Sequence, residues 1–198
     1  ELDLMRRAAA TTKAAHIACM AAARPGKNEC EIDALLEWHF RASGGTGAAY
    51  NNIVASGANA TILHYNENNA VMKDGDLLLI DAGAEHDWYA CDVTRTFPVN
   101  GRFSKQQRAL YEVVLEAQLK AIAHVQPGVS FVSVHETALR ALIDGLVHLG
   151  LLRGSVDEQL KKDDYRRFYM HRTSHWLGLD VHDCGAYNVD GTSRRLEA

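Results

Sequence analysis

The feature that most constrains the fold of this chain is a pair of helical patterns joined by Pro-Gly, which occurs twice. Apolar residues at helical spacing precede Pro25-Gly26 and a second helical pattern follows it; the same arrangement surrounds Pro127-Gly128, 102 residues later. The repeat indicates an internal duplication, although Pro-Gly is a common helix exit and chance is the alternative. If the duplication holds, each half is a helix pair followed by strands, and the two sets of strands join in one sheet.

Between the helix pairs the apolar period changes to two, which predicts strands. The expected strands are residues 50–56, 61–64, 77–81 and 89–99. Ser104 with Gln107, and Ser133 with Glu136, have the capping-box spacing that opens a helix. We therefore expect an α+β chain whose first half covers about residues 1–100 and whose second half covers about 101–198. Few strand patterns follow Gly150, so the second half is expected to be incomplete.

Composition narrows the classes of partner. The 198 residues carry 21 Lys and Arg against 25 Asp and Glu, so the sequence offers no basic surface for nucleic acid and no polybasic membrane anchor. Its apolar runs are far shorter than the roughly 18 residues needed to span a bilayer. The four cysteines are widely spaced without a C-x-x-C pair, which predicts free thiols in a cytoplasmic protein.

Two aspartates give the first chemical signal. Leu77-Leu78-Leu79-Ile80-Asp81 is an apolar strand ending in a carboxylate, and Asp92 lies on the next predicted strand. A hairpin centred on His86-Asp87 places Asp81 directly opposite Asp92, with Cβ atoms about 4.5 to 5.5 Å apart. Two facing carboxylates repel each other unless one is protonated or a cation lies between them, which favours a metal. A simple turn cap at Asp81, or a bulge that breaks the register, is the alternative.

Histidines give the second signal. Residues 170–183 contain His171, His175 and His182, a density that packing alone does not explain. The spacing of four between the first two resembles the helical H-E-x-x-H zinc motif, but Arg172 follows His171 and no Glu lies between the pair. Any one of these histidines can be an ordinary hydrogen-bonded structural residue, whereas the cluster favours function. His64, at the end of a predicted strand, is a further candidate.

Three segments together resemble the catalytic domain of the Xaa-Pro aminopeptidases, the aminopeptidase P enzymes of the pita-bread metallopeptidase family. They are ILHYNENNAVMKDGDLLLIDAG, YACDVTRTFPVNGRFS and HRTSHWLGLDVHDCGAY. The similarity runs along essentially the whole chain, so residues 1–198 are expected to be part of such a catalytic domain. The resemblance implies the pita-bread (creatinase/aminopeptidase) fold, which is built from two related halves.

The resemblance also implies a metal site. Asp81 matches the first metal-binding aspartate, Asp92 matches the aspartate that bridges two metals, and His175 matches the histidine ligand of the other metal. The implied cofactors are two divalent ions, usually manganese and in some members zinc or cobalt, acting as Lewis acids. His64, His171 and His182 match active-site histidines that are not ligands and that contact the substrate or stabilise the charged intermediate.

The implied reaction releases the amino-terminal residue from peptides with proline in second position. A near alternative is Xaa-Pro dipeptidase (prolidase), which takes only dipeptides. A second is a pita-bread module that has lost its metals and binds peptides or proteins, and a third is a metal-free hydrolase of the creatinase type. Retention of both aspartates disfavours the last two.

The sequence departs from the family pattern in three respects. Two further metal-binding glutamates of the family lie beyond the segment that matches residues 194–198, and the family's amino-terminal domain, which often mediates oligomerisation, has no counterpart. Arg172 stands where glycine is usual. We therefore expect this chain to be a segment of a larger, homo-oligomeric enzyme, and activity of the segment alone to be doubtful.

Overall fold

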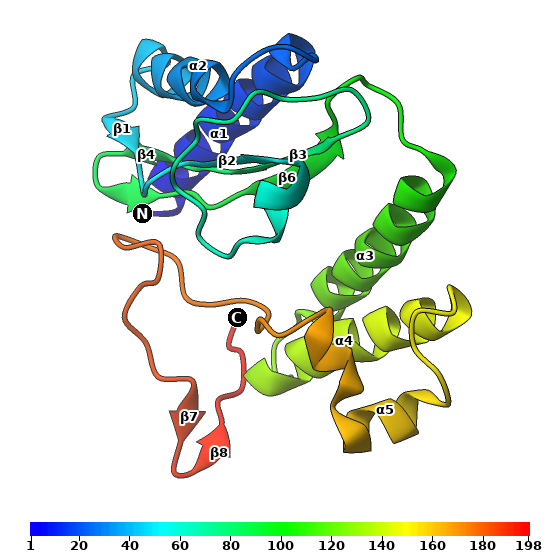
Figure 1. Cartoon of the computed structure of the whole chain (residues 1–198). Coiled ribbons are helices and arrows are strands. Elements are labelled where there is room, and N and C mark those ends of the chain that lie inside the picture. Colours follow the sequence, from blue (N-terminus) through cyan, green and yellow to red (C-terminus); the bar gives the residue numbers. More distant parts are fainter. The chain divides into compact units, whose positions relative to one another are not determined.

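The computed structural model describes all residues 1–198, and the chain forms two compact units (Figure 1). The first unit contains residues 1–103 together with 176–184, and the second contains residues 104–175 together with 185–198. Helices and short antiparallel strands make up both, in keeping with the expected α+β class. None of the helices combines the length and the apolar character that crossing a membrane requires.

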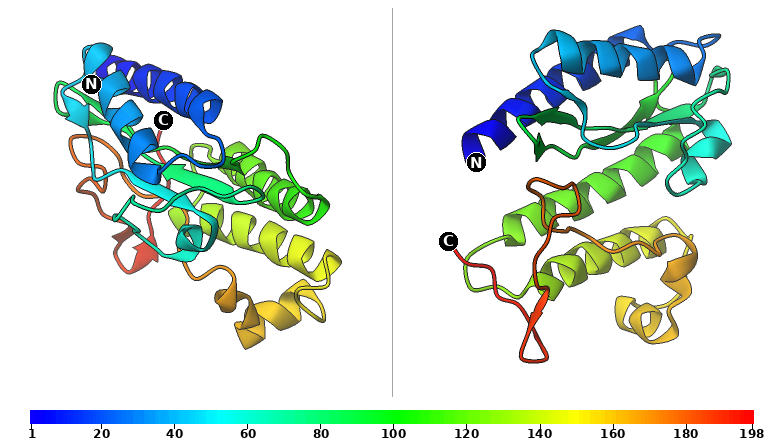
Figure 2. Two further views of the ribbon diagram at one scale, coloured as in Figure 1. Left: turned by 45° about the horizontal axis from the view of Figure 1, so that its top comes forward. Right: turned by 90° about the vertical axis from the view of Figure 1, so that its left-hand side faces the viewer.

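Two helices of the first unit pack on the same side of its strands (Figure 2). These are α1 (Leu2–Ala22) and α2 (Glu29–Ala42). Asn28 caps α2 in a capping box, since its side chain accepts from the backbone of the first turn and the Glu31 side chain accepts from the Asn28 amide. The buried faces of both helices and the inner face of the strands form one core, which contains Cys19, Ile32, Leu36, Phe40, Val54, Leu78 and Ile80.

The strands of the first unit form two antiparallel sheets of three strands each. One sheet has the order β1-β4-β5, with β1 (Gly47–Ala48), β4 (Ala84–His86) and β5 (Tyr89–Ala90). The other has the order β2-β3-β6, with β2 (Ile53–Ser56), β3 (Leu77–Asp81) and β6 (Thr94–Pro98). Alternate residues of β3 are fully buried, so its apolar run anchors the second sheet to the core.

Two of the strand predictions for this unit were wrong. No strand occupies residues 61–64, because the short 3-10 helix η1 (Gly57–Thr61) ends there and His64 adopts a left-handed backbone conformation (φ 55°). The expected strand 89–99 is divided into β5 and β6, which belong to different sheets. Residues 91–93 belong to neither strand, although the Cys91 amide and the Val93 carbonyl still pair with Ala84 and Ala82.

The predicted register of the aspartate hairpin was also wrong. His86 pairs with Tyr89, so the turn is centred on Asp87-Trp88, whose φ angles of 47° and 72° suit a two-residue hairpin turn. Asp81 therefore pairs with Thr94 and not with Asp92. The residue opposite Asp81 is therefore two positions further along the chain than predicted. Because side chains alternate between the faces of a strand, Asp92 stays on the same face as Asp81, at a diagonal position.

The second unit is mainly helical. It contains α3 (Lys105–His124), α4 (Phe131–His148), α5 (Val156–Lys162), the 3-10 helix η2 (Asp164–Arg167) and a two-stranded sheet of β7 (Asn188–Val189) and β8 (Thr192–Ser193). Ser104 and Gln107 form the expected capping box at α3. The cap of α4 is Ser130 and not Ser133, whose amide donates to the Ser130 side chain. The expected joining of both sets of strands in one sheet was wrong, because β7 and β8 form a sheet of their own.

The two units repeat one backbone pattern at the Pro-Gly positions. The amide of Gly26 donates to the carbonyl of Met72 (2.9 Å), and the Met72 amide donates back to the residue after Gly26 (2.8 Å). In the second unit Gly128 donates to Leu196 (2.8 Å), which donates back to the residue after Gly128 (2.9 Å). If the two Pro-Gly pairs had arisen by chance, there would be no reason for both to form the same long-range hydrogen bonds. The matching pattern therefore favours an internal duplication.

Candidate active site

Asp81 and Asp92 of the first unit lie on either side of one hydroxyl group. Tyr50, in the loop between β1 and β2, has its hydroxyl oxygen 2.5 Å from Asp81 Oδ1 and 2.8 Å from Asp92 Oδ1. Asp81 is the last residue of β3, and Asp92 lies in the segment between β5 and β6. Three separate parts of the first unit thus bring these groups together.

Burial and the close approach of these groups shift the pKa values of Asp81 and Tyr50. Burial raises the pKa of the Asp81 carboxyl; the Tyr50 hydrogen bond opposes this change, and the neighbouring Asp92 carboxylate adds to it. Burial and both aspartates also raise the pKa of the Tyr50 phenol. A phenol has a single proton and cannot donate fully to two carboxylates at once. The two carboxylates therefore have more hydrogen-bond acceptor sites than this one hydroxyl can satisfy. A positive charge between them would stabilise both carboxylates.

A glycine permits this close approach. A Cβ atom on Gly83 would overlap the backbone carbonyl of Cys91, the residue before Asp92. The backbone pairing is continuous across this position, because Ala82 donates to the Val93 carbonyl (3.1 Å) and Cys91 donates to the Ala84 carbonyl (3.1 Å). Gly83 therefore allows the segment between β3 and β4 to contact the segment between β5 and β6, at the boundary of the two sheets.

The aspartates line a cavity of about 320 Å³ that also contains two of the predicted histidines. His64 and His182 are both exposed and lie in this lining, with Asn51, Ile53, Asn66 and Val181. His182 reaches the first unit because residues 176–184 belong to it, and the Ala90 amide donates to the Gly178 carbonyl (2.9 Å). Four of the six predicted site residues thus share one cavity.

The remaining two predicted residues belong to the second unit. His171 is exposed, lines a separate cavity of about 420 Å³ and has its Nδ1 2.7 Å from the Arg172 carbonyl oxygen. His175 is half-buried in the same unit. Their meeting with the aspartates stays a prediction.

The sequence analysis did not identify Tyr50 as a site residue, and Asn51 and Asn66 were also missed. Tyr50 and Asn51 lie within the predicted strand 50–56, which in the structure begins only at Ile53, and Asn66 follows the predicted strand 61–64. Many surface residues share such positions. The contact of Tyr50 with both aspartates depends on the long-range packing of β1, β3 and β6, which no local pattern encodes.

The residues of the first cavity suit a divalent cation in part. Carboxylate oxygens are good ligands for manganese, zinc and related ions. Burial, and to a smaller extent the neighbouring Asp92 carboxylate, raise the pKa of Asp81. The structure contains no group of three or more His, Cys, Asp or Glu side chains arranged to hold a metal. Asp81 and Asp92 are therefore candidates for part of a ligand set.

The fold and these acidic residues agree with a family assignment. Residues 3–198 match metallopeptidase family M24, and the chain belongs to that family. It is 48% identical over 190 residues to a Xaa-Pro aminopeptidase of Haemophilus influenzae and 47% identical over 197 residues to that of Escherichia coli. These alignments cover 96% and 100% of this chain and 44% of each relative.

Solved structures give the same result. Aminopeptidase PepP of Pseudomonas aeruginosa superposes with a TM-score of 0.98 at 53% identity, covering 100% of this chain and 45% of that one. A zinc-substituted E. coli aminopeptidase P in complex with product has a TM-score of 0.96 at 47% identity, with 100% and 44% coverage. The chain therefore has the pita-bread fold predicted from its sequence, and it spans less than half the length of these relatives.

Proposed function

We propose that this chain is part of a metal-dependent Xaa-Pro aminopeptidase, which releases the first residue of peptides whose second residue is proline. The observation that carries the proposal is the pair of carboxylates of Asp81 and Asp92, both within hydrogen-bond distance of the Tyr50 hydroxyl in a cavity that also holds His64 and His182. Membership of a metallopeptidase family and the names of the relatives support it.

Asp81 and Asp92 would hold two divalent ions together with His175 and ligands from outside this chain. Bound there, such ions supply Lewis acidity to the peptide carbonyl. Manganese is the proposed metal, with zinc or cobalt as substitutes; the zinc-substituted E. coli relative supports the choice of a divalent ion. Tyr50 would orient both carboxylates, since its hydroxyl lies between them.

The histidines supply donors and proton carriers. His64 and His182 line the same cavity as the aspartates, and an imidazole there can donate a hydrogen bond to the carbonyl oxygen that becomes negative when the peptide carbonyl is attacked. His171 is proposed as a further active-site histidine on the resemblance alone. The six residues would then combine metal binding with stabilisation of charge.

The proposed substrates are peptides, and the name of the E. coli aminopeptidase P, a variant of which is known in complex with substrate, supports this choice. Assembly into a homo-oligomer through parts outside this chain belongs to the same proposal. The cytoplasmic location is supported by the four cysteines, all of which are free thiols.

The test is hydrolysis of Leu-Pro-Ala and Leu-Pro by the complete protein, with manganese and after chelation, for the wild type and Asp92→Ala. We expect release of leucine from the tripeptide, dependent on metal and abolished by the substitution. Asp74→Ala, at an exposed residue outside the cavity, is the matched control and should keep full activity. Metal-independent turnover, or normal turnover in Asp92→Ala, would refute the proposal; cleavage of the dipeptide alone would indicate a prolidase.

A further inference from the structure

Among the six candidate site residues, His64 is the one with a strained backbone. It lies between η1 and β3, and its φ of 55° is in the left-handed region, which is unfavourable for a residue that has a Cβ atom. Its ring is exposed in the cavity that contains Asp81 and Asp92, so packing around the ring does not fix its position. The surrounding chain must therefore hold the backbone at His64 in this conformation.

Tyr65, the next residue, anchors this turn in the first unit. Its amide donates to the Ile62 carbonyl (3.3 Å), which closes the turn 62–65 around His64. Only 6% of Tyr65 is exposed, and the residue belongs to an apolar cluster with Ile53 and Ala55 of β2. The exposed histidine is thus attached directly to a buried ring.

The hydroxyl of Tyr65 binds a buried carboxylate on α2. It donates to Glu29 Oε2 (2.9 Å) and accepts from Asn59 Nδ2 (3.1 Å). Burial opposes ionisation of Glu29, but the hydrogen bonds to the carboxylate outweigh burial and lower its pKa. Glu29 is therefore charged at neutral pH and can only accept hydrogen bonds, which fixes the direction of the bond from Tyr65.

Glu29 holds three points of the segment that carries His64. Its Oε1 accepts from the amide and the hydroxyl of Ser56 (both 2.7 Å), and its Oε2 accepts from Tyr65 and from the Ala70 amide (3.0 Å). The segment 56–70 thus begins and ends at this carboxylate, and Tyr65 joins its middle to the same group. A buried charge is weak evidence for stability, whereas a fully satisfied polar network specifies one arrangement of the chain.

Ser56 and Tyr65 make the same kind of contact with different expected consequences. Each donates a hydroxyl to one oxygen of Glu29. Ser56 is also held by its pairing with Leu78 in the sheet and by the hydrogen bond from its amide. Tyr65 lies outside the helices and strands, and its hydroxyl joins the turn at His64 to α2. Loss of the Tyr65 hydroxyl should therefore loosen this turn, whereas loss of the Ser56 hydroxyl should not.

We propose that Tyr65 is a positioning residue: through its hydrogen bond to Glu29 it holds the turn at His64, and so sets where the His64 imidazole meets the carbonyl group of a bound peptide. The part of this statement that concerns a peptide rests on the proposed function. The part that concerns the turn rests on the contacts of Tyr65.

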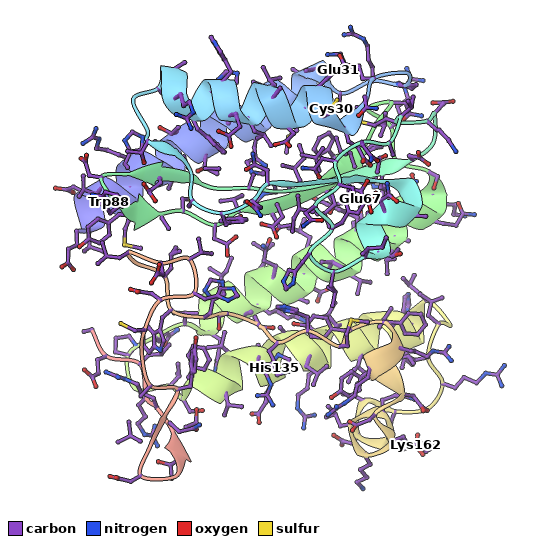
Figure 3. All side chains as sticks on the ribbon, turned by 60° about the vertical axis from the view of Figure 1, so that its left-hand side comes forward. Cys30, Glu31, Glu67, Trp88, His135 and Lys162 are labelled. Carbon is purple, nitrogen blue, oxygen red and sulfur yellow. The ribbon has the colours of Figure 1, made fainter.

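Hydrogen exchange at the amide of residue 65 tests the turn in the complete, metal-free protein without requiring catalysis. Tyr65→Phe removes only the hydroxyl, and we expect this amide to exchange about tenfold faster. Ser56→Ala removes the other hydroxyl that donates to Glu29, and Glu67→Gln changes an exposed residue of the same segment (Figure 3). Neither should change the rate by more than about twofold. An unchanged rate in Tyr65→Phe, or an equal rise in Ser56→Ala, would overturn the inference.

A double-mutant cycle with His64→Ala connects the turn to catalysis. For hydrolysis of Leu-Pro-Ala with manganese, Tyr65→Phe should lower kcat/KM about tenfold at unchanged metal content, whereas Ser56→Ala should keep full activity. In the His64→Ala background, Tyr65→Phe should have no further effect, because the side chain that it positions is absent. An equal loss in both backgrounds would show that Tyr65 acts through the fold as a whole, and would contradict the positioning role.

The two experiments also separate this inference from the proposed function. Normal hydrolysis by Tyr65→Phe retains the peptidase and rejects the positioning role of Tyr65. Absence of hydrolysis by the wild type, together with faster exchange in Tyr65→Phe, rejects the peptidase and retains Tyr65 as the residue that holds the turn at His64.

Discussion

The α-carbon of Gly83 lies directly against the backbone carbonyl of Cys91, so that a Cβ atom at position 83 has no room. The obstacle is main chain and not the end of a flexible side chain, and relief requires the two strands to separate. This contact is next to the place where Asp92 approaches Asp81. It therefore links the stability of the first unit to the geometry of the candidate active site.

Gly83→Ala is expected to lower the free energy of unfolding by about 3 kcal/mol, because the added methyl group must push the Cys91 backbone away. Chemical denaturation of the complete protein measures this loss. Gly75→Ala is the control: this glycine has a φ of 85° but open space around its α-carbon, so only backbone strain of about 1 kcal/mol is expected. Similar losses for the two variants would show that the overlap is not the cause.

Local signals were sufficient for most of the helices and for one strand. The helix before each Pro-Gly and the capping box at Ser104 were predicted correctly, because their determinants lie within one or two turns of the chain. The apolar run 77–81 was recognised as a strand for the same reason. The start of α4 was placed three residues late, because Ser133 has Glu136 at the capping-box spacing whereas the true cap, Ser130, has Ser133 at that position and no capping box.

The errors concern turns and long-range packing. Asp87-Trp88 forms the hairpin turn without the Asn-Gly or Asp-Gly sequence that favours such turns, so no local signal placed the centre of the hairpin there. The aspartates were still predicted on one face, because an error of two residues preserves the alternation of side chains. The role of Tyr50 depends on contacts across more than 30 residues and was beyond sequence patterns.

Tyr50→Phe is expected to destabilise the metal-free protein by about 1 to 2 kcal/mol, since it removes the hydroxyl that lies within hydrogen-bond distance of both carboxylates. Added manganese should reduce this loss of stability, because a bound cation between the carboxylates takes the place of the Tyr50 hydroxyl proton. Denaturant unfolding with chelator and with manganese measures both values. Tyr187→Phe, at a tyrosine of the second unit, is the control; an equal metal effect in both variants would contradict the assigned position of Tyr50.

Glu29 is expected to stabilise the first unit through its charge. Its carboxylate is fully buried and accepts from the Ser56 amide and hydroxyl, Asn59, Tyr65 and the Ala70 amide at 2.7 to 3.2 Å. Burial alone raises the pKa of this carboxyl, but the hydrogen bonds outweigh burial and the pKa lies below its ordinary value of 4.5. Glu29→Gln turns an amide group toward some of these donors and should cost about 3 kcal/mol at pH 7.

The pH dependence of that loss tests its origin. Because the folded pKa of Glu29 is lower than the unfolded one, its contribution is complete above pH 4.5 and declines as the pH falls through the folded pKa. The stability difference between wild type and Glu29→Gln should therefore shrink below pH 4.5. Glu67→Gln, at an exposed residue, should show little difference at any pH. A difference independent of pH would assign the loss to packing and not to charge.

His182→Ala is expected to separate catalysis from metal binding in the complete protein. His182 is an exposed residue of the cavity that contains Asp81 and Asp92, and we place it outside the ligand set as a hydrogen-bond donor to the reacting carbonyl. Its loss should lower kcat about 100-fold while the metal content per chain is unchanged. Steady-state kinetics and elemental analysis after dialysis measure the two quantities. His148→Ala, at the exposed end of α4, should change neither; loss of metal from His182→Ala would instead identify His182 as a ligand.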